Sequence, residues 1–318
     1  RVNWQPARAR RPVRLCLLCL VALIGVLLFV AAEVSAQVPC PVPLEDRQRY
    51  GFAAFSGNWP GTFDISQLNA GWYVDHARVT NPPEGMDRAL VVRVYPDYTV
   101  DASTLGPLVD ANPGAMWLVG NEPDCIWQDN VYPEEYARIY HDVYSFIKNR
   151  DRTSQVAAGG IVQPTPLRLE YLDRVLEAYL DFYGQALPLD LWQIHNAILN
   201  EERGGWGAGI PPGIEADTGV LRDLYTDNDN MEYFETQIWA FRRWMADRGY
   251  GGYPLVITEF GVLLPDDYTY DVARVNAFMS ATFDFLSTAQ EPTLGDPNDG
   301  YRLVQRWAWF SLDIPPWD

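Results

Sequence analysis

Histidine is scarce in this sequence, which has three histidines, His76, His141 and His195, among 318 residues. They are too few and too widely spaced to predict a histidine-based zinc site. The sequence also lacks a glycine-rich phosphate loop, a Gly-x-Ser-x-Gly nucleophile elbow and a basic patch for nucleic acid. We therefore expect no metal, no cofactor and no nucleic-acid partner.

Positive charge is also in short supply. The chain has 24 basic and 42 acidic residues, and its net charge is −18. Such an excess of negative charge repels nucleic acid and anionic membrane surfaces. It suits a neutral substrate better than a polyanionic one, although solubility alone would also account for it.

The first 36 residues have the pattern of a targeting segment. A cluster of arginines leads into an apolar stretch over 13–32, and Val34-Ser35-Ala36 supplies small residues for cleavage before Gln37. The stretch is about as long as the roughly 20 residues that cross a bilayer. We expect a signal peptide over 1–36, or alternatively a retained membrane anchor. The protein is therefore predicted to be secreted or held at the cell envelope, with membrane contact through this segment only.

Cysteine is rare as well, and two of the four cysteines lie in the apolar stretch. Cleavage would leave Cys40 and Cys125. In an exported protein such a pair favours a disulfide bond, which here would tie the mature N-terminus to the loop just past Glu122. Two unpaired thiols are the alternative.

The remainder, 37–318, alternates between strand-like and helix-like patterns, which predicts one α/β domain with a parallel sheet. Its length is enough for a (β/α)8 TIM barrel, which takes roughly 250 residues. The expected strands are 51–55, 71–75, 90–95, 115–120, 155–160, 189–195, 255–259 and 303–310, and the clearest helices are 133–149, 167–183, 232–248 and 270–289.

The barrel is expected to be irregular early and short at its end. The segment 76–88 contains Asn81-Pro82-Pro83 and has no helical pattern. The chain starts with Arg rather than Met and stops at Asp318, with no helix after the last strand. We therefore expect truncation after strand eight, which leaves the closure of the barrel open.

Two glutamates follow apolar runs of strand length. Glu122 lies in Gly120-Asn121-Glu122-Pro123-Asp124 after the apolar run 116–119, and Glu259 lies in Ile257-Thr258-Glu259-Phe260-Gly261 at the end of the apolar run 254–257. Carboxyl ends of barrel strands meet at one face, where active sites form. Strands four and seven would bring the two carboxylates to about 5 Å, as in retaining glycoside hydrolysis. A structural salt bridge for either glutamate is the competing interpretation.

These motifs resemble the glycoside hydrolases of clan A, which carry Asn-Glu-Pro on strand four and a second glutamate on strand seven. The resemblance covers strands four to eight and implies a (β/α)8 barrel. It implies that Glu122 is the acid/base and Glu259 the nucleophile. Asn121 would then hydrogen-bond the sugar 2-hydroxyl group.

The same resemblance implies roles for residues on other strands. Trp309 would form the floor of the subsite for the cleaved sugar. His195 would lie near the nucleophile, with a purely structural histidine as the alternative. Strands one to three match the clan poorly, so Arg93 is a weak candidate for substrate binding.

Aromatic residues are abundant, with 12 Trp, 18 Tyr and 13 Phe. Trp59, Trp127 and Trp206 fall in expected loops on the active face, where each is either a platform for stacking a sugar or an anchor for its loop. Trp206 lies in the long segment 196–230, which we expect to form a lid or a subsite wall. These features favour an extended cleft for an oligosaccharide or polysaccharide.

The sequence thus predicts an exported retaining glycoside hydrolase that cleaves β-linked neutral glycans, with endo action on a polysaccharide. The alternative is a catalytically silent barrel that binds glycans at the cell envelope. The sugar and the linkage are not defined by these patterns.

Overall fold

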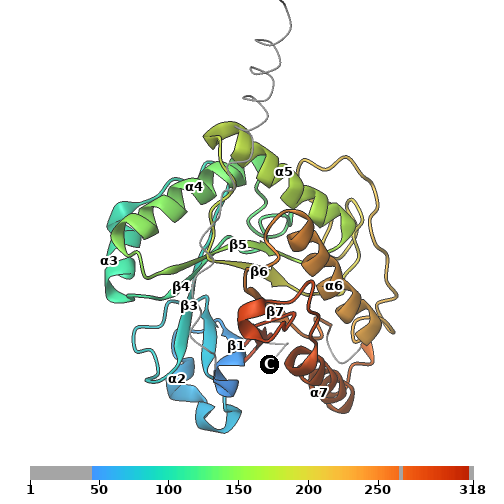
Figure 1. Cartoon of the computed structure of the whole chain (residues 1–318). Coiled ribbons are helices and arrows are strands. Elements are labelled where there is room, and N and C mark those ends of the chain that lie inside the picture. Colours follow the sequence, from blue (N-terminus) through green and yellow to red (C-terminus); the bar gives the residue numbers. More distant parts are fainter. Residues whose placement is uncertain (1–44, 265–267, 315–318) are drawn as a thin grey trace, which may run out of the picture. The chain divides into compact units, whose positions relative to one another are not determined.

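A computed structural model describes residues 45–264 and 268–314 and shows a closed barrel of eight parallel strands in chain order (Figure 1). The predicted α/β barrel is confirmed. Residues 1–44, which include the predicted targeting segment and Cys40, lie outside the described residues. Within the described ranges, no helix is both long and apolar enough to cross a membrane.

The strands are β1 (Tyr50–Ala54), β2 (Trp72–Asp75), β3 (Asp87–Val92), β4 (Met116–Val119), β5 (Gln155–Ile161), β6 (Leu191–His195), β7 (Leu255–Phe260) and β8 (Arg306–Trp309). The α-helices are α2 (Trp59–Thr62), α3 (Ala102–Ala111), α4 (Pro133–Arg150), α5 (Pro166–Tyr183), α6 (Met231–Asp247) and α7 (Val272–Thr288). Short 3-10 helices are η1 (Asp46–Arg49), η2 (Ile65–Leu68) and η4 (Pro297–Asp299).

The barrel closes between its first and last strands. Gly51 of β1 lies opposite Ala308 of β8, and Phe52 lies opposite Trp309. A Cβ on Gly51 would lie 2.6 Å from the indole of Trp72, so glycine is required at this position for the ring to fill the barrel. The closure that the sequence left open is therefore complete in the structure.

All eight predicted strands are present, with shifted ends. The largest error is at β3, which starts and ends three residues before the predicted 90–95. Its first residues, Asp87 and Arg88, are polar, but they pair with Trp72 and Tyr73 of β2. Pairing at the amino end of the barrel needs no apolar side chain, so the hydrophobic pattern missed this part of the strand.

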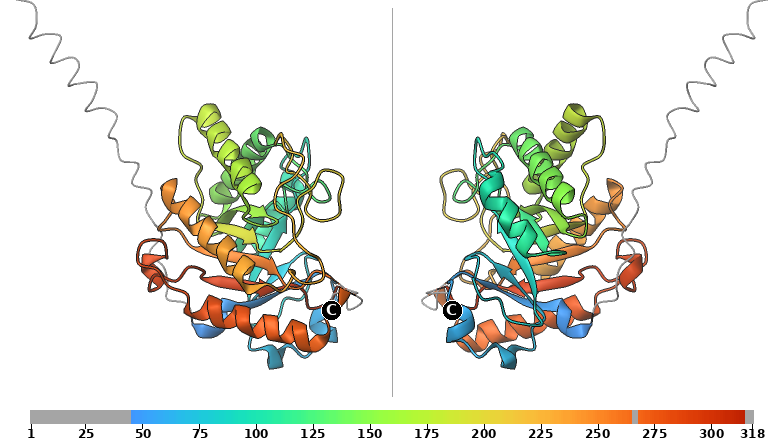
Figure 2. Two further views of the ribbon diagram at one scale, coloured as in Figure 1. Left: turned by 90° about the vertical axis from the view of Figure 1, so that its right-hand side faces the viewer. Right: turned by 90° about the vertical axis from the view of Figure 1, so that its left-hand side faces the viewer.

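The four predicted helices are also present, within two residues of their expected ends. As predicted, the connection from β2 to β3 contains no helix. Helix α3 was not predicted, because Gly106 and Pro107 in its interior are poor helix formers. The helices line the outside of the strands, and α4 and α5 pack side by side (Figure 2).

Two apolar layers hold the barrel together. One lies between the strands and the surrounding helices, and buries the apolar faces of α4, α5, α6 and α7. The other fills the barrel interior with side chains from alternate strand positions, as packing in such barrels requires. The interior set is Ala53, Trp72, Val74, Ala89, Val91, Met116, Leu118, Ala157, Leu191, Val256 and Ala308.

Candidate active site

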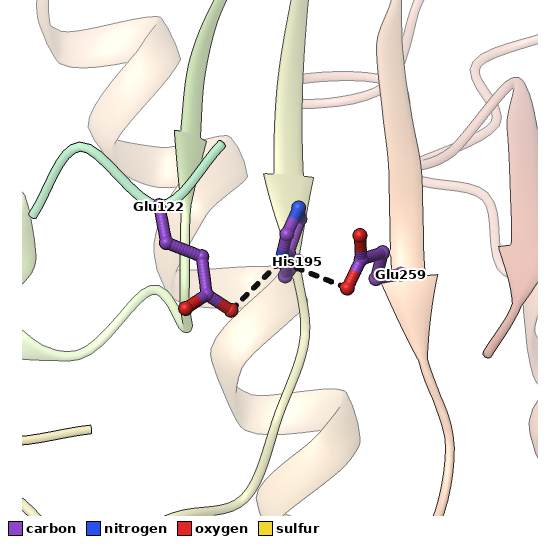
Figure 3. A group of neighbouring side chains, drawn as sticks. All are labelled: Glu122, His195 and Glu259. Atoms are coloured by element: carbon purple, nitrogen blue, oxygen red, sulfur yellow. Dashed lines mark hydrogen bonds and ion pairs between the residues drawn. The ribbon is translucent and has the colours of Figure 1, made fainter. Parts of the chain in front are cut away.

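His195 lies between the two predicted catalytic glutamates (Figure 3). Its Nδ1 atom is 3.1 Å from Oε1 of Glu122 and 3.6 Å from Oε2 of Glu259. One ring nitrogen of His195 and one oxygen of each glutamate all lie within 4.8 Å of one another. One oxygen of each carboxylate thus approaches the other about as closely as the separation of about 5 Å that the sequence predicts.

A shift in strand register sets His195 opposite Glu259. Ile194 of β6 pairs with Ile257 of β7, but the next pair is His195 with Glu259, so Thr258 is an extra residue in β7. Bulges of this kind re-aim side chains and are common beside active sites. This one places both groups at the carboxyl end of the barrel.

The backbone at Glu122 has a left-handed conformation, with φ of 50°. Its N–H donates a 2.8 Å hydrogen bond to the carbonyl of Gly160. Gly160 also has positive φ, and a Cβ there would lie 2.9 Å from the carbonyl oxygen of Gly120. A left-handed non-glycine residue costs about 1–3 kcal/mol and persists only where its surroundings fix it, so the fold holds Glu122 in this orientation.

A buried carboxylate, Asp129, fixes the residue before Glu122. It accepts hydrogen bonds from the backbone N–H groups of Asn121 at 2.8 Å and Val94 at 2.9 Å, and from the guanidinium of Arg93. Asn121 and Arg93 thus line the same cleft as Glu122. Arg93 is 35 % exposed, and its guanidinium is committed in part to Asp129.

His76 was missed as a site residue. Its Nε2 atom is 3.0 Å from Oε1 of Glu259, close enough for an ion pair, although it makes no well-aligned hydrogen bond within the described part of the chain. Its ring stacks on Phe55, with ring centres 4.1 Å apart. The available signal was position: His76 directly follows the expected strand 71–75, and both glutamates also lie at the ends of expected strands.

The two histidines control the charge of Glu259. Burial alone would raise the pKa of Glu259, but the charges of His195 and His76 outweigh it and lower the pKa below its ordinary value. Burial alone would lower the pKa of His195, but Glu259 and Glu122 together raise it to about 9. An ionised Glu259 beside a protonated His195 is the arrangement that these shifts favour.

The glutamates open into a cleft of about 560 Å³, a size typical of ligand sites. Its walls come from loops at the carboxyl ends of the strands. Of the residues predicted to bind substrate, Arg93, Asn121, Trp127 and Trp206 line it, together with Phe55, Gln128 and Phe310.

Two residues predicted to bind substrate do not line the cleft: His195, which is buried between the glutamates, and Trp309. Because Ala308 points into the barrel, Trp309 points outward, where it packs against Phe260 with ring centres 5.4 Å apart and against Phe283. The next residue, Phe310, lines the cleft instead. Strand alternation therefore turns Phe310, one residue later than expected, toward the cleft.

The three loop tryptophans have different environments. Trp127 is 64 % and Trp206 is 54 % exposed, and both line the cleft. Trp59 is fully buried, with its ring edge-on to Phe52 and Tyr73, so it is a structural anchor and not a platform.

Cys125 is buried beside the cleft. Within the described residues it has no disulfide partner. Its predicted partner, Cys40, lies outside them, so the disulfide bond stays a prediction.

Glu122, His195 and Glu259 are also close enough together to hold a metal ion. A histidine binds a metal only in its neutral form. Because the pKa of His195 is raised to about 9, a metal would have to displace a tightly held proton.

No protein-family model and no curated protein sequence matches this chain. Its fold is similar to solved structures of GH128 glucanases. One is an endo-β-1,3-glucanase of subgroup II from Pseudomonas viridiflava, with a TM-score of 0.54 and 17 % identity over 84 % of this chain and 88 % of that one.

A second is a subgroup I endo-β-1,3-glucanase from Amycolatopsis mediterranei in complex with laminaritriose, with a TM-score of 0.53 and 17 % identity over 84 % and 89 % of the two chains. A third is a curdlan-specific exo-β-1,3-glucanase of subgroup III from Blastomyces gilchristii, with a TM-score of 0.50 and 15 % identity over 83 % and 89 %. At such low identity the likeness establishes the fold alone, a (β/α)8 barrel, as the sequence predicts.

Proposed function

We propose that this protein is an exported retaining glycoside hydrolase that cleaves β-linked neutral glucans. The observation that carries the proposal is the glutamate pair, which has an oxygen of each residue within 4.8 Å of the other. Retaining enzymes hold their carboxyl groups about 5–5.5 Å apart, whereas inverting enzymes leave about 6.5–9.5 Å for a water molecule.

In the first step, Glu259 attacks the anomeric carbon while Glu122 donates a proton to the glycosidic oxygen. The C–O bond to the leaving sugar breaks, and a covalent glycosyl ester forms on Glu259. The lowered pKa of Glu259 supports its role as the ionised nucleophile, since His195 and His76 stabilise the negative charge.

In the second step, Glu122 takes a proton from water, and the resulting hydroxide attacks the same carbon. The ester bond breaks, which releases the sugar and restores the Glu259 carboxylate. Two inversions give net retention. His195, at 3.1 Å from Glu122 and 3.6 Å from Glu259, orients one oxygen of each carboxylate, and His76 lies 3.0 Å from the second oxygen of Glu259.

β-1,3-Glucans are the first substrates to test, because the solved structures with this fold include β-1,3-glucanases. Trp127 and Trp206 present exposed rings beside the glutamates, on which the apolar faces of sugars can stack. Such a wall supports binding of several sugars at once and therefore endo action.

The test is to assay laminarin and laminari-oligosaccharides with wild type, Glu259→Ala and Glu122→Ala, with and without azide. Each variant should lose activity, Glu259→Ala by more than about 10⁴-fold because no covalent ester can form. Azide should rescue Glu259→Ala and give an α-glycosyl azide. It should rescue Glu122→Ala on an activated substrate and give the β-glycosyl azide.

Glu170→Ala is the matched control, since Glu170 is an exposed glutamate on the outside of α5. It should retain wild-type activity. Wild type without activity on any β-glucan, or Glu259→Ala with wild-type activity, would refute the proposal. Glucan binding without hydrolysis would favour the silent glycan-binding barrel.

A metal-dependent hydrolase is the second candidate, because the same three side chains could ligate a divalent ion. Dialysis against EDTA distinguishes the two. The glycosidase should keep its full activity, and loss of activity that Zn²⁺ or Mn²⁺ restores would favour the metal enzyme.

A further inference from the structure

Arg168, on the first turn of α5, is fully buried and carries a charge that the proposed reaction does not use. All five of its N–H groups have acceptors, which is the full capacity of a guanidinium. The acceptors are the Asp124 carboxylate and carbonyl (2.9 Å to the carbonyl), the Glu201 carboxylate (2.9 Å), and the carbonyls of Ala208 (2.8 Å) and Gly209 (2.9 Å).

These acceptors belong to two loops that both contribute residues to the cleft wall. Asp124 lies in the acid/base loop, which we define as residues 120–132. Glu201, Ala208 and Gly209 lie in the Trp206 loop, which we define as residues 196–230. The acid/base loop lines the cleft through Glu122 and Trp127, and the Trp206 loop lines it through Trp206 and Ala208.

On each side the anchored residue is two positions from a residue of the cleft. Asp124 is two residues after Glu122, and the Glu122 carbonyl accepts a 3.0 Å hydrogen bond from the N–H of Cys125. Ala208 is two residues after Trp206. A Cβ on the intervening Gly207 would lie 2.4 Å from the carbonyl oxygen of Asn200, so this part of the loop is closely packed. A shift of Ala208 would therefore also move Trp206.

The Glu201 carboxylate is itself held from several directions. It accepts hydrogen bonds from the hydroxyl of Thr165, from Gln163 Nε2 at 3.3 Å and from the N–H of Val220 at 3.1 Å. Thr165 and Gln163 follow β5, so the cluster joins the carboxyl ends of β4, β5 and β6. A group with so many partners fixes geometry more strongly than a single ion pair does.

We propose that Arg168 is a positioning residue that sets the Trp206 loop against the acid/base loop, so that a glucan stacked on Trp206 presents its glycosidic oxygen to Glu122. The inference rests on the proposed function, because it concerns how a sugar bound on Trp206 is aligned with the proton donor Glu122. Arginine is needed because one planar group must reach both loops; the ammonium of lysine has three donors and cannot span them.

The test compares Arg168→Lys with Arg242→Lys. Arg242 is equally buried, on α6, and donates to the carbonyls of Leu303 and Tyr253 and to Gln305, at the other end of the barrel. Arg168→Lys should lower kcat/KM on laminarihexaose by about 10²-fold, the cost of misplacing reacting groups by about 1 Å. Arg242→Lys, per folded molecule, should stay within about 3-fold of wild type. Equal losses in the two variants would overturn the proposal.

Two isosteric variants test separately the contacts of Arg168 with the acid/base loop and with the Trp206 loop. They also cover the case in which Arg168→Lys does not fold. Asp124→Asn should lower kcat for phenyl β-laminaritrioside about 10-fold, which is part of the 10²–10⁴-fold that a general acid supplies. It should leave kcat for the 2,4-dinitrophenyl analogue unchanged, because that leaving group needs no proton. Glu201→Gln should raise KM for laminarihexaose but not for these short substrates. Identical effects of both variants on all substrates would overturn the proposal.

Failure of the proposed function gives a different result. If wild type cleaves no glucan, the affinity for laminarihexaose, measured by calorimetry, still tests the role of Arg168. Weaker binding to Arg168→Lys than to Arg242→Lys would support it, and equal binding would overturn it.

Discussion

The two ends of the barrel each contain a fully buried arginine, and the two arginines have different partners. At the amino end, Arg242 donates to two carbonyls and an amide oxygen, and burial lowers its pKa to about 10. At the carboxyl end, burial would also lower the pKa of Arg168, but the charges of Asp124 and Glu201 outweigh it and raise the pKa.

The difference between the partners of the two arginines matches the different roles of the two barrel ends. Neutral acceptors at the amino end fix the starts of β7 and β8 without adding charge, which serves stability. The carboxyl end concentrates carboxylates around Arg168, Arg93, His76 and His195, which is costly to bury unless each charge is paired. In barrels of this type the carboxyl end carries catalysis and the amino end carries stability, and the following variants test whether this division holds here.

The largest effect on stability is expected for Arg242→Met. It leaves three buried acceptors without their donor, so we expect the free energy of unfolding to fall by about 2–4 kcal/mol. Turnover per folded molecule at low temperature should not change. Chemical denaturation measured beside kcat checks both parts, and a large loss of kcat in the folded fraction would break the division between the two ends.

His195→Gln should have a moderate effect at the catalytic end. It removes the group between Glu122 and Glu259, and we expect kcat to fall about 10- to 10²-fold because the carboxylates lose their alignment. A variant with wild-type kcat would show that His195 is only structural.

His195 should also impose a pH dependence on stability. Its pKa is about 9 in the folded protein, above an unfolded value of about 6.5. The stabilisation is therefore complete below about pH 6.5 and is lost as the pH rises through about 9. Wild type should lose more Tm than His195→Gln between pH 7 and pH 9.5, and parallel curves for the two proteins would contradict the assignment.

A smaller effect is expected at the rim of the cleft. Trp127→Ala should raise KM for long laminari-oligosaccharides about 5- to 10-fold, since a stacked ring contributes about 1 kcal/mol. Trp127→Phe, which keeps a flat apolar face, should recover most of this loss. An unchanged KM for Trp127→Ala on every chain length would remove Trp127 from the binding surface.

The smallest effect is expected for an exposed ion pair on the same helix as Arg168. Glu170 and Arg174 lie one turn apart on α5, 47 % and 37 % exposed, with 2.8 Å between their charged atoms. Water screens such pairs, so Glu170→Ala should change Tm by less than about 2 °C. A larger change would show that α5 depends on its surface charges as well as on Arg168.

The sequence predicted the barrel, its eight strands and both glutamates, because buried strands and strand-end carboxylates leave local patterns. It did not predict His76 or Phe310. Their roles depend on strand register, and a bulge that adds one residue, as Thr258 does in β7, changes which side chain faces the cleft. It also missed Arg168, whose partners are 33–44 positions away in the chain, since a helix pattern does not reveal contacts made between loops.

The central claim is that Glu122 and Glu259 cleave glucans with retention, and the anomer of the first product tests it most directly. Proton NMR during hydrolysis of laminarin, before mutarotation, should show the β-anomer at the new reducing end. If the α-anomer appears first, the reaction inverts, and the double displacement on Glu259 is contradicted.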